Sequence, residues 1–123
     1  MGSLLKAAGI LAALSFAIAP IARAADTAGA DKKTEKLWKA KCSSCHGVDG
    51  KAQTTQGKKE GVRDMTAAAY QSEVTDDRIK DSLKNGVKKE EGGKKVEMPA
   101  FADLKDDQVE ALIKHIRSFG GKK

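Results

Sequence analysis

Two cysteines and a histidine lie within five consecutive positions, at Cys42, Cys45 and His46, and the chain has no other cysteine. Cysteines at this spacing can form a disulfide, a thiol–disulfide exchange site or an attachment site for haem. A disulfide across two intervening residues would join no distant parts of the chain. An exchange site lies at a strand-to-helix turn, and no run of β-branched residues flanks this motif. The C-x-x-C-H order therefore favours haem attachment.

The spacing of the motif has a direct chemical reason. Two thiols three positions apart lie on one face of a helix, so Cys42 and Cys45 can each bond to one of the two haem vinyl groups. His46 follows at once, and its ring nitrogen can bind the iron as the proximal ligand. The motif thus predicts one covalent haem c, with its iron, as the cofactor.

The iron of such a site can take a second axial ligand. Outside the motif, thioethers and imidazoles after residue 24 occur only at Met65, Met98 and His115. Met98 precedes Pro99, which holds it extended in a loop before the last helix, so Met98 is favoured as the distal ligand. Met65 and His115 are explained more simply by packing, and an open sixth position is the remaining alternative.

Residues 1–24 have the layout of a cleavable secretory signal. A positive start with Lys6 precedes a mostly apolar stretch at 7–21, and Ala22-Arg23-Ala24 offers small residues for a peptidase that cleaves after Ala24. The apolar stretch is shorter than the roughly 20 residues that span a bilayer, and a retained anchor is the alternative. We therefore expect export to the periplasm, with no stable membrane insertion after cleavage.

The remaining 99 residues are too polar to form a large core by themselves. Residues 25–123 carry 21 basic and 17 acidic side chains, and only 15 of Leu, Ile, Val or Phe. That share is about 15%, below the roughly 20% under which a charged chain is suspected of disorder. A porphyrin would supply the missing apolar surface. Length and composition exclude a multidomain enzyme, a polytopic membrane protein and a disulfide-dense scaffold.

The elements expected to position the motif are helices joined by loops, with no strand. Residues 25–33 are small and polar and predict a flexible N-terminal segment. A first helix is predicted from Thr34, as its N-cap, to Cys42. Because 84–97 is rich in Lys and Gly, most of it is expected to be a loop.

Two later helices have clearer signals. Thr75, followed by two aspartates, is a good N-cap, and the helix it begins is expected to end at Gly86. The last helix is marked by apolar residues at i, i+3, i+4 and i+7, and Gly120 stops it. These apolar residues are Val109, Leu112, Ile113 and Ile116.

Three segments resemble the class I c-type cytochromes. Residues 37–47, LWKAKCSSCHG, resemble the haem-binding start of that family, and residues 97–101, EMPAF, resemble its Met-ligand loop. Residues 104–119 resemble its C-terminal helix. The resemblance extends over essentially all of 34–120.

This resemblance implies an all-α, small cytochrome c fold in a domain spanning 34–121, with three to five helices around one covalent haem. The first and last helices would cross, with Trp38 and Phe119 packed at the crossing. His46 would be the proximal ligand and Met98 the distal one. The implied function is that of a soluble one-electron carrier between redox partners, not an enzyme. We expect a monomer. The family often has an aromatic residue where this chain has His115.

The charge pattern bears on the choice of partner. Residues 31–41 carry five Lys and two acidic residues, and residues 84–97 carry five Lys and three acidic residues. If both segments border the haem edge, they would form a positive rim for a redox partner with an acidic docking surface. Nucleic acid is not an expected partner, because the lysines are mixed with nearly as many acids.

Two other functional classes compete with an electron carrier. A gas-binding or enzymatic haem protein needs a sixth position that is open or easily vacated, and no distal acid–base pair for such chemistry is evident. A thiol–disulfide oxidoreductase would use Cys42 and Cys45 as free thiols, which covalent haem attachment would prevent.

Overall fold

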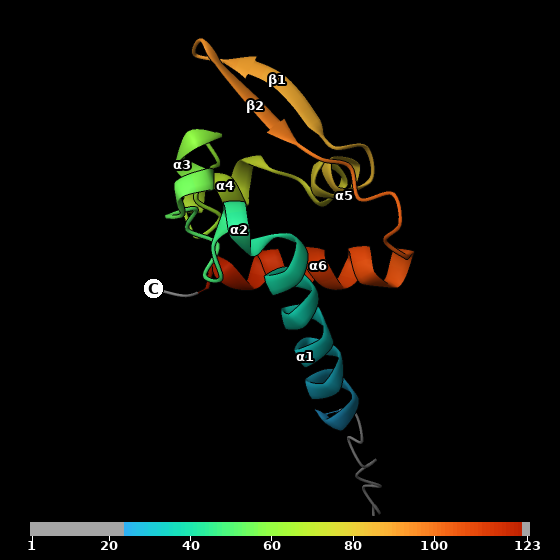
Figure 1. Ribbon diagram of the computed structural model, residues 1–123. Helices are drawn as coiled ribbons and strands as arrows, with labels where there is room; N and C mark the ends of the chain where they lie inside the picture. Colours follow the sequence, from blue (N-terminus) through green and yellow to red (C-terminus); the bar gives the residue numbers. More distant parts are fainter. Residues whose placement is uncertain (1–23, 122–123) are drawn as a thin grey trace, which may run out of the picture.

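The computed structural model describes residues 24–121, which form helices and one two-stranded sheet (Figure 1). This confirms the predicted all-α class, with a small hairpin added. The described part has more helices than the three to five expected because α2 and α3 are only four and five residues long. In chain order the elements are α1 (Ala24–Lys41), α2 (Ser43–His46), α3 (Thr55–Lys59), α4 (Ala68–Glu73), α5 (Asp76–Asn85), β1 (Val87–Glu91), β2 (Lys94–Met98) and α6 (Asp106–Phe119).

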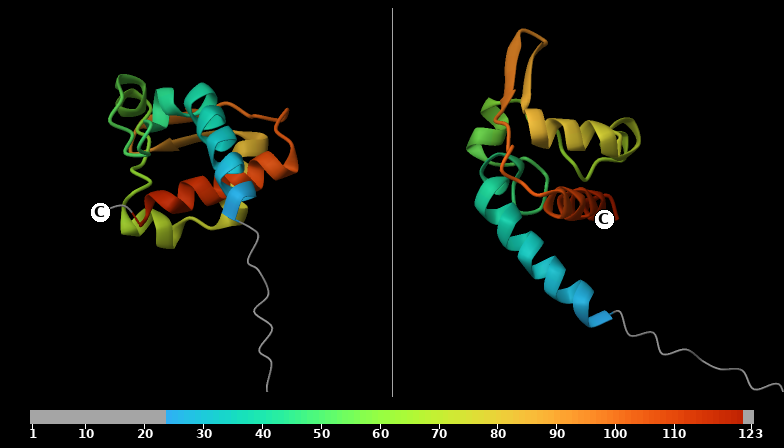
Figure 2. Two further views of the ribbon diagram at one scale, coloured as in Figure 1. Left: turned by 90° about the horizontal axis from the view of Figure 1, so that it is seen from below. Right: turned by 90° about the vertical axis from the view of Figure 1, so that its right-hand side faces the viewer.

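Helices α1 and α6 cross (Figures 1 and 2), and aromatic side chains fill the crossing. The rings of Trp38 and Phe119 are almost fully buried, and their centroids are 5.3 Å apart. His115 lies beside them, with its ring centroid 5.2 Å from that of Trp38 and 4.9 Å from that of Phe119. Aromatic pairs at these separations are favourable beyond the area they bury. The histidine thus takes the packing position where the family often has an aromatic ring.

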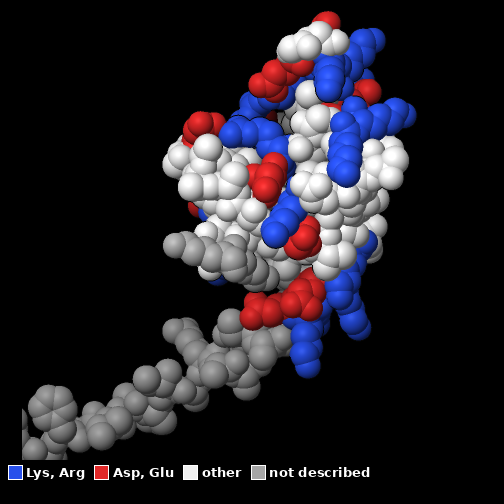
Figure 3. Space-filling model, turned by 90° about the vertical axis from the view of Figure 1, so that its left-hand side faces the viewer, with Lys and Arg blue, Asp and Glu red and all other residues white. Residues whose placement is uncertain are grey.

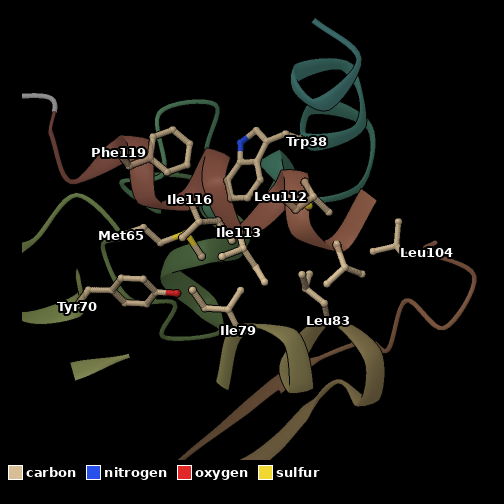
Figure 4. Close-up of a cluster of buried hydrophobic side chains, with 12 residues drawn as sticks. Trp38, Met65, Tyr70, Ile79, Leu83, Leu104, Leu112, Ile113, Ile116 and Phe119 are labelled. Carbon is tan, nitrogen blue, oxygen red and sulfur yellow. The ribbon is translucent and has the colours of Figure 1, made fainter. Parts of the chain in front are cut away.

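The apolar faces of α5 and α6 supply most of the remaining core (Figure 4). Thr75 caps α5 as predicted, because its hydroxyl accepts a hydrogen bond from the Arg78 N–H. Ile79 and Leu83 lie one turn apart on α5, and both are buried. The side chains that α6 buries are Val109, Leu112, Ile113, Ile116 and Phe119, which confirms the predicted helical stripe.

The predicted start of the first helix is wrong. Helix α1 begins at Ala24, so Thr34 lies inside it and is buried rather than serving as an N-cap. Residues 25–33 contain no proline and three alanines, which favour a helix, and this outweighs their small, polar character. The division into 1–24, 25–33 and 34–121 stays a prediction, and residues 1–23 of the proposed signal lie outside the described residues. No helix within 24–121 is long and apolar enough to cross a membrane.

The absence of strands was also wrongly predicted, because residues 87–98 form a β-hairpin. Strands β1 and β2 pair antiparallel in a register that sets Val87 opposite Met98 and Glu91 opposite Lys94. The turn residues Gly92 and Gly93 both have positive φ, at 59° and 75°. A two-residue hairpin turn of type I′ requires positive φ at both central residues, and glycine adopts that conformation without steric cost. The hairpin stands above α5 at one end of the molecule (Figure 1).

Gly57 lies on α3, and because it has no Cβ it allows this helix to pack close to Cys45. A Cβ at this position would overlap the carbonyl oxygen of Cys45 and lie 2.8 Å from that of Ala52. We expect Gly57→Ala to destabilise the folded protein by about 1–3 kcal/mol, the usual cost of overpacking, and thermal unfolding would measure this. Gly121→Ala is the control, because its Cβ would meet nothing nearer than 4.0 Å. Equal stability of both variants would contradict the predicted steric clash.

Candidate cofactor site

A cavity of about 310 Å³ lies between α2, α5, the hairpin and the chain that leads from α3 to α4. Its lining includes the four residues singled out by the sequence, Cys42, Cys45, His46 and Met98. His46 and Met98 come from segments far apart in sequence. Most of the other lining side chains are apolar; among them are Trp38, Val62, Ile79, Leu83, Val96, Phe101 and Ile116.

The end of α1 and the short helix α2 place the two thiols at this cavity. The Cys42 N–H donates to the Trp38 carbonyl at 2.8 Å, and the His46 N–H donates to the Cys42 carbonyl at 3.0 Å. The Thr54 hydroxyl donates a hydrogen bond to the Cys45 carbonyl at 3.2 Å. Both cysteines are free thiols, with Cys42 buried and Cys45 half-buried. Burial raises the pKa of the Cys42 thiol to about 11, so this thiol stays protonated at neutral pH.

His46 is held in an apolar setting. Its ring centroid lies 5.7 Å from that of Trp38, whose indole N–H donates to the Gly47 carbonyl at 2.9 Å. Burial lowers the pKa of His46 to about 4, so the ring is neutral at pH 7. Its buried Nδ1 has no hydrogen-bond partner among the described residues. A neutral imidazole is the form that binds a metal ion.

Both methionines considered as distal ligands line the cavity, whereas His115 does not. Met65 is packed in the core with 6% of its surface exposed, and Met98 is half-buried at the end of β2. Several contacts tie the Met98 segment to α5. The Phe101 N–H donates to the Leu83 carbonyl at 2.8 Å, and the backbone of Gly86 lies so close that a Cβ there would be 2.6 Å from the Met98 carbonyl oxygen.

The hairpin wall and two polar residues of the cavity were not found from sequence. One face of the hairpin, with Val87, Lys89 and Val96, lines the cavity beside Met98. A β-branched residue lies on each side of the Gly-Gly pair, at Val87 and Val96, and this was the available signal for a hairpin. Tyr70 and Arg63 also line the cavity. No motif marks them, because they reach it through the packing of α4 and the chain before it.

These residues fit a covalently bound haem. Two free thiols lie at the wall of an apolar cavity, next to a neutral imidazole with an unpaired buried nitrogen and with thioethers on other walls. No group of three or more His, Cys, Asp or Glu side chains within 24–121 could hold a metal ion by itself. The donor set therefore suits an iron that arrives in a porphyrin, which supplies four of its ligands.

Comparisons with known proteins agree with this donor set. The model of a family described as "Cytochrome C oxidase, cbb3-type, subunit III" matches residues 29–116, a span that includes both the C-x-x-C-H motif and Met98. Among solved structures, a chain titled "KustC0563 c-type cytochrome" is 30% identical, with a TM-score of 0.57. That match covers 70% of this chain and 95% of the other. No curated protein matches this chain significantly.

Proposed function

Because this chain belongs to the class I c-type cytochromes, an electron-carrying family that binds haem c, we propose that it is an exported one-electron carrier with His46 and Met98 as axial iron ligands. The observation that carries the proposal is a single cavity lined by both thiols, the neutral imidazole and the Met98 thioether. The small fold of the described residues is that of this family.

Each of these residues has a distinct task. The thiols of Cys42 and Cys45 bond to the two vinyl groups and fix the cofactor against α2. Haem, when bound, supplies an iron that gains and loses one electron. His46 and Met98 would both hold the iron, so little rearrangement would accompany the gain or loss of one electron. A thioether ligand and an apolar lining both favour the reduced iron and raise its potential. No substrate bond is made, so we propose no enzymatic activity.

An optical spectrum of the matured protein tests this proposal. The protein would be produced in a strain with haem-attachment machinery and examined oxidised, reduced, and reduced under carbon monoxide. We expect a low-spin spectrum that carbon monoxide does not change, with the weak far-red band of a ferric iron–thioether bond. A high-spin spectrum, or ready binding of carbon monoxide, would refute the proposed ligation and favour a gas-binding haem protein instead.

Export belongs to the same proposal and rests on the sequence of residues 1–24. The periplasm is the proposed location of the mature protein. The mass of the matured chain tests this directly, since cleavage after Ala24 leaves Ala25 as the first residue. A mature chain that kept its apolar segment would contradict it.

The positive charge around the cavity supports docking of a redox partner with an acidic surface. Lys41 and Lys89, from the two Lys-rich stretches, both line the cavity. Figure 3 shows Lys and Arg side chains over the hairpin and along the face below it, interspersed with carboxylates. Some of this charge is offset by ion pairs such as Lys88–Glu97, but Lys95, near the hairpin tip, has no ion pair among the described residues.

We expect the rate of electron transfer to an acidic partner to fall by about tenfold as ionic strength rises from low to physiological values, because salt screens the attraction that steers the encounter. Lys95→Glu should lower the rate at low salt. Lys114→Glu is the control and should have little effect, because Lys114 lies on α6, outside both Lys-rich stretches. A rate independent of salt would rule out electrostatic docking.

A further inference from the structure

Strand β2 has an open edge. It pairs with β1 on one side, and among residues 24–121 no other strand and no other backbone group is hydrogen-bonded to it. The hairpin projects beyond the helices at one end of the molecule (Figure 1; Figure 2, right). The outward N–H and C=O groups of β2 are therefore available to a further strand.

A two-stranded hairpin is only marginally stable by itself in water. One face of this hairpin lines the cavity through Val96, where a cofactor would cover it. The opposite face is exposed and carries charges paired across the strands, and its members are Lys88, Glu90, Lys95 and Glu97. A third strand beside β2 would satisfy the open edge, which neither face of the hairpin can do.

The charges of β2 are complementary to those of a second β2. If two copies of this strand pair antiparallel about Val96, each Lys95 lies opposite Glu97 of the other copy, on both sides of the two-fold axis. The two Val96 side chains meet at the axis, and Lys94 lies opposite Met98. Pairs of opposite charge stabilise antiparallel strands, whereas like charges directly opposite destabilise them. This register contains no pair of like charges.

Charge disfavours the neighbouring registers and the other edge of the hairpin. An axis at Lys95 or at Glu97 would place that residue opposite its own copy. On β1, residues 88–91 are all charged, so an axis at any of them has the same fault. Lysines on an edge strand normally prevent such pairing. The register about Val96 is the exception, because each charge that it pairs directly faces an opposite one.

We propose that the open edge of β2 is a self-association surface, where a second copy of this chain pairs its own β2 antiparallel about Val96. The product is a four-stranded sheet in which both hairpins turn their cavity-lining faces to the same side. Five paired residues form a small interface, so the association is weak and the chain is the expected monomer at low concentration. The inference goes beyond the proposed function and does not depend on the ligands of the iron.

Sedimentation velocity of the mature protein tests the proposal. We expect the weight-average sedimentation coefficient to rise between about 10 μM and about 1 mM, with a dissociation constant on the order of 0.1–1 mM, as suits a small transient interface. The amide NMR signals of residues 94–98 should shift over the same range. A sedimentation coefficient that does not rise across these concentrations would overturn the proposal.

Two charge variants test the register. Lys95→Glu and Glu97→Lys each place like charges opposite one another on both sides of the axis, so each should weaken self-association by about tenfold or more. An equimolar mixture of the two variants should restore association to within about threefold of the unaltered protein, because every altered charge then faces an opposite one. NMR secondary shifts of residues 87–98 would show that each variant keeps the hairpin.

Lys114→Glu is the matched control, because it makes the same change of net charge as Lys95→Glu but lies on α6. It should alter self-association less than about twofold, the effect expected of a change in net charge alone. Self-association that persists in both charge variants, or that the mixture fails to restore, would refute pairing about Val96. An equal loss in Lys114→Glu would refute the β2 edge as the surface.

Discussion

Protein produced without haem attachment is expected to be largely unfolded, with most of its helical circular dichroism lost. Several of the largest buried side chains face the cavity as well as the core, among them Trp38, Met65, Ile79, Leu83 and Ile116. Without a cofactor, the sides of these residues that face the cavity would either contact water or pack poorly against one another. The packing energy of those surfaces would then be lost. The remaining apolar residues are too few to offset the conformational entropy lost when residues 24–121 become ordered.

The variant Cys42→Ala/Cys45→Ala, expressed under the same conditions as the unaltered protein, provides this test. The single tryptophan, Trp38, gives a near-ultraviolet signal that reports the α1–α6 crossing, and this signal should disappear. Ser43→Ala/Ser44→Ala is the control, because it alters the same turn but keeps both thiols and His46. A helical spectrum with a cooperative thermal transition in the cysteine variant would show that the chain folds without haem.

The motifs that carry chemistry were predictable because each depends on local sequence. Cys42, Cys45 and His46 are placed by a single turn of helix, and the stripe on α6 follows from its spacing alone. Pro99 and the EMPAF segment likewise identified Met98 as a residue of interest. The structure brings these residues to one cavity, and the comparisons confirm the family. The predicted roles of the four residues remain proposals.

What the sequence did not reveal depends on contacts between distant segments. The hairpin is stabilised by pairing across Gly92-Gly93, although its charged residues lack the usual alternation of a strand. Tyr70 and Arg63 reach the cavity only through the packing of α4 against the rest of the core. The start of α1 was wrong for a different reason, since a polar composition was taken as a sign of a loose segment despite good helix formers.

Met98→Ala is expected to abolish the far-red band, to open the iron to carbon monoxide, and to lower the midpoint potential. The fall should be on the order of a few tenths of a volt, within the range of about 0.8 V that axial ligands span. Removing the thioether removes the ligand that favours reduced iron, and water or an added ligand then takes the sixth position. Spectra with and without carbon monoxide and a potentiometric titration measure all three effects.

Met65→Leu separates ligation from packing, because Met65 is the other thioether that lines the cavity. A leucine conserves most of its volume, so this variant should cost less than about 1.5 kcal/mol and keep the far-red band. Loss of the band in Met65→Leu and its retention in Met98→Ala would reverse the assignment of the distal ligand. The expected outcome follows from how the two residues are held. Met65 is packed inside the core, whereas the β1–β2 register, Gly86 and the Phe101–Leu83 hydrogen bond fix the backbone of Met98 at the cavity wall.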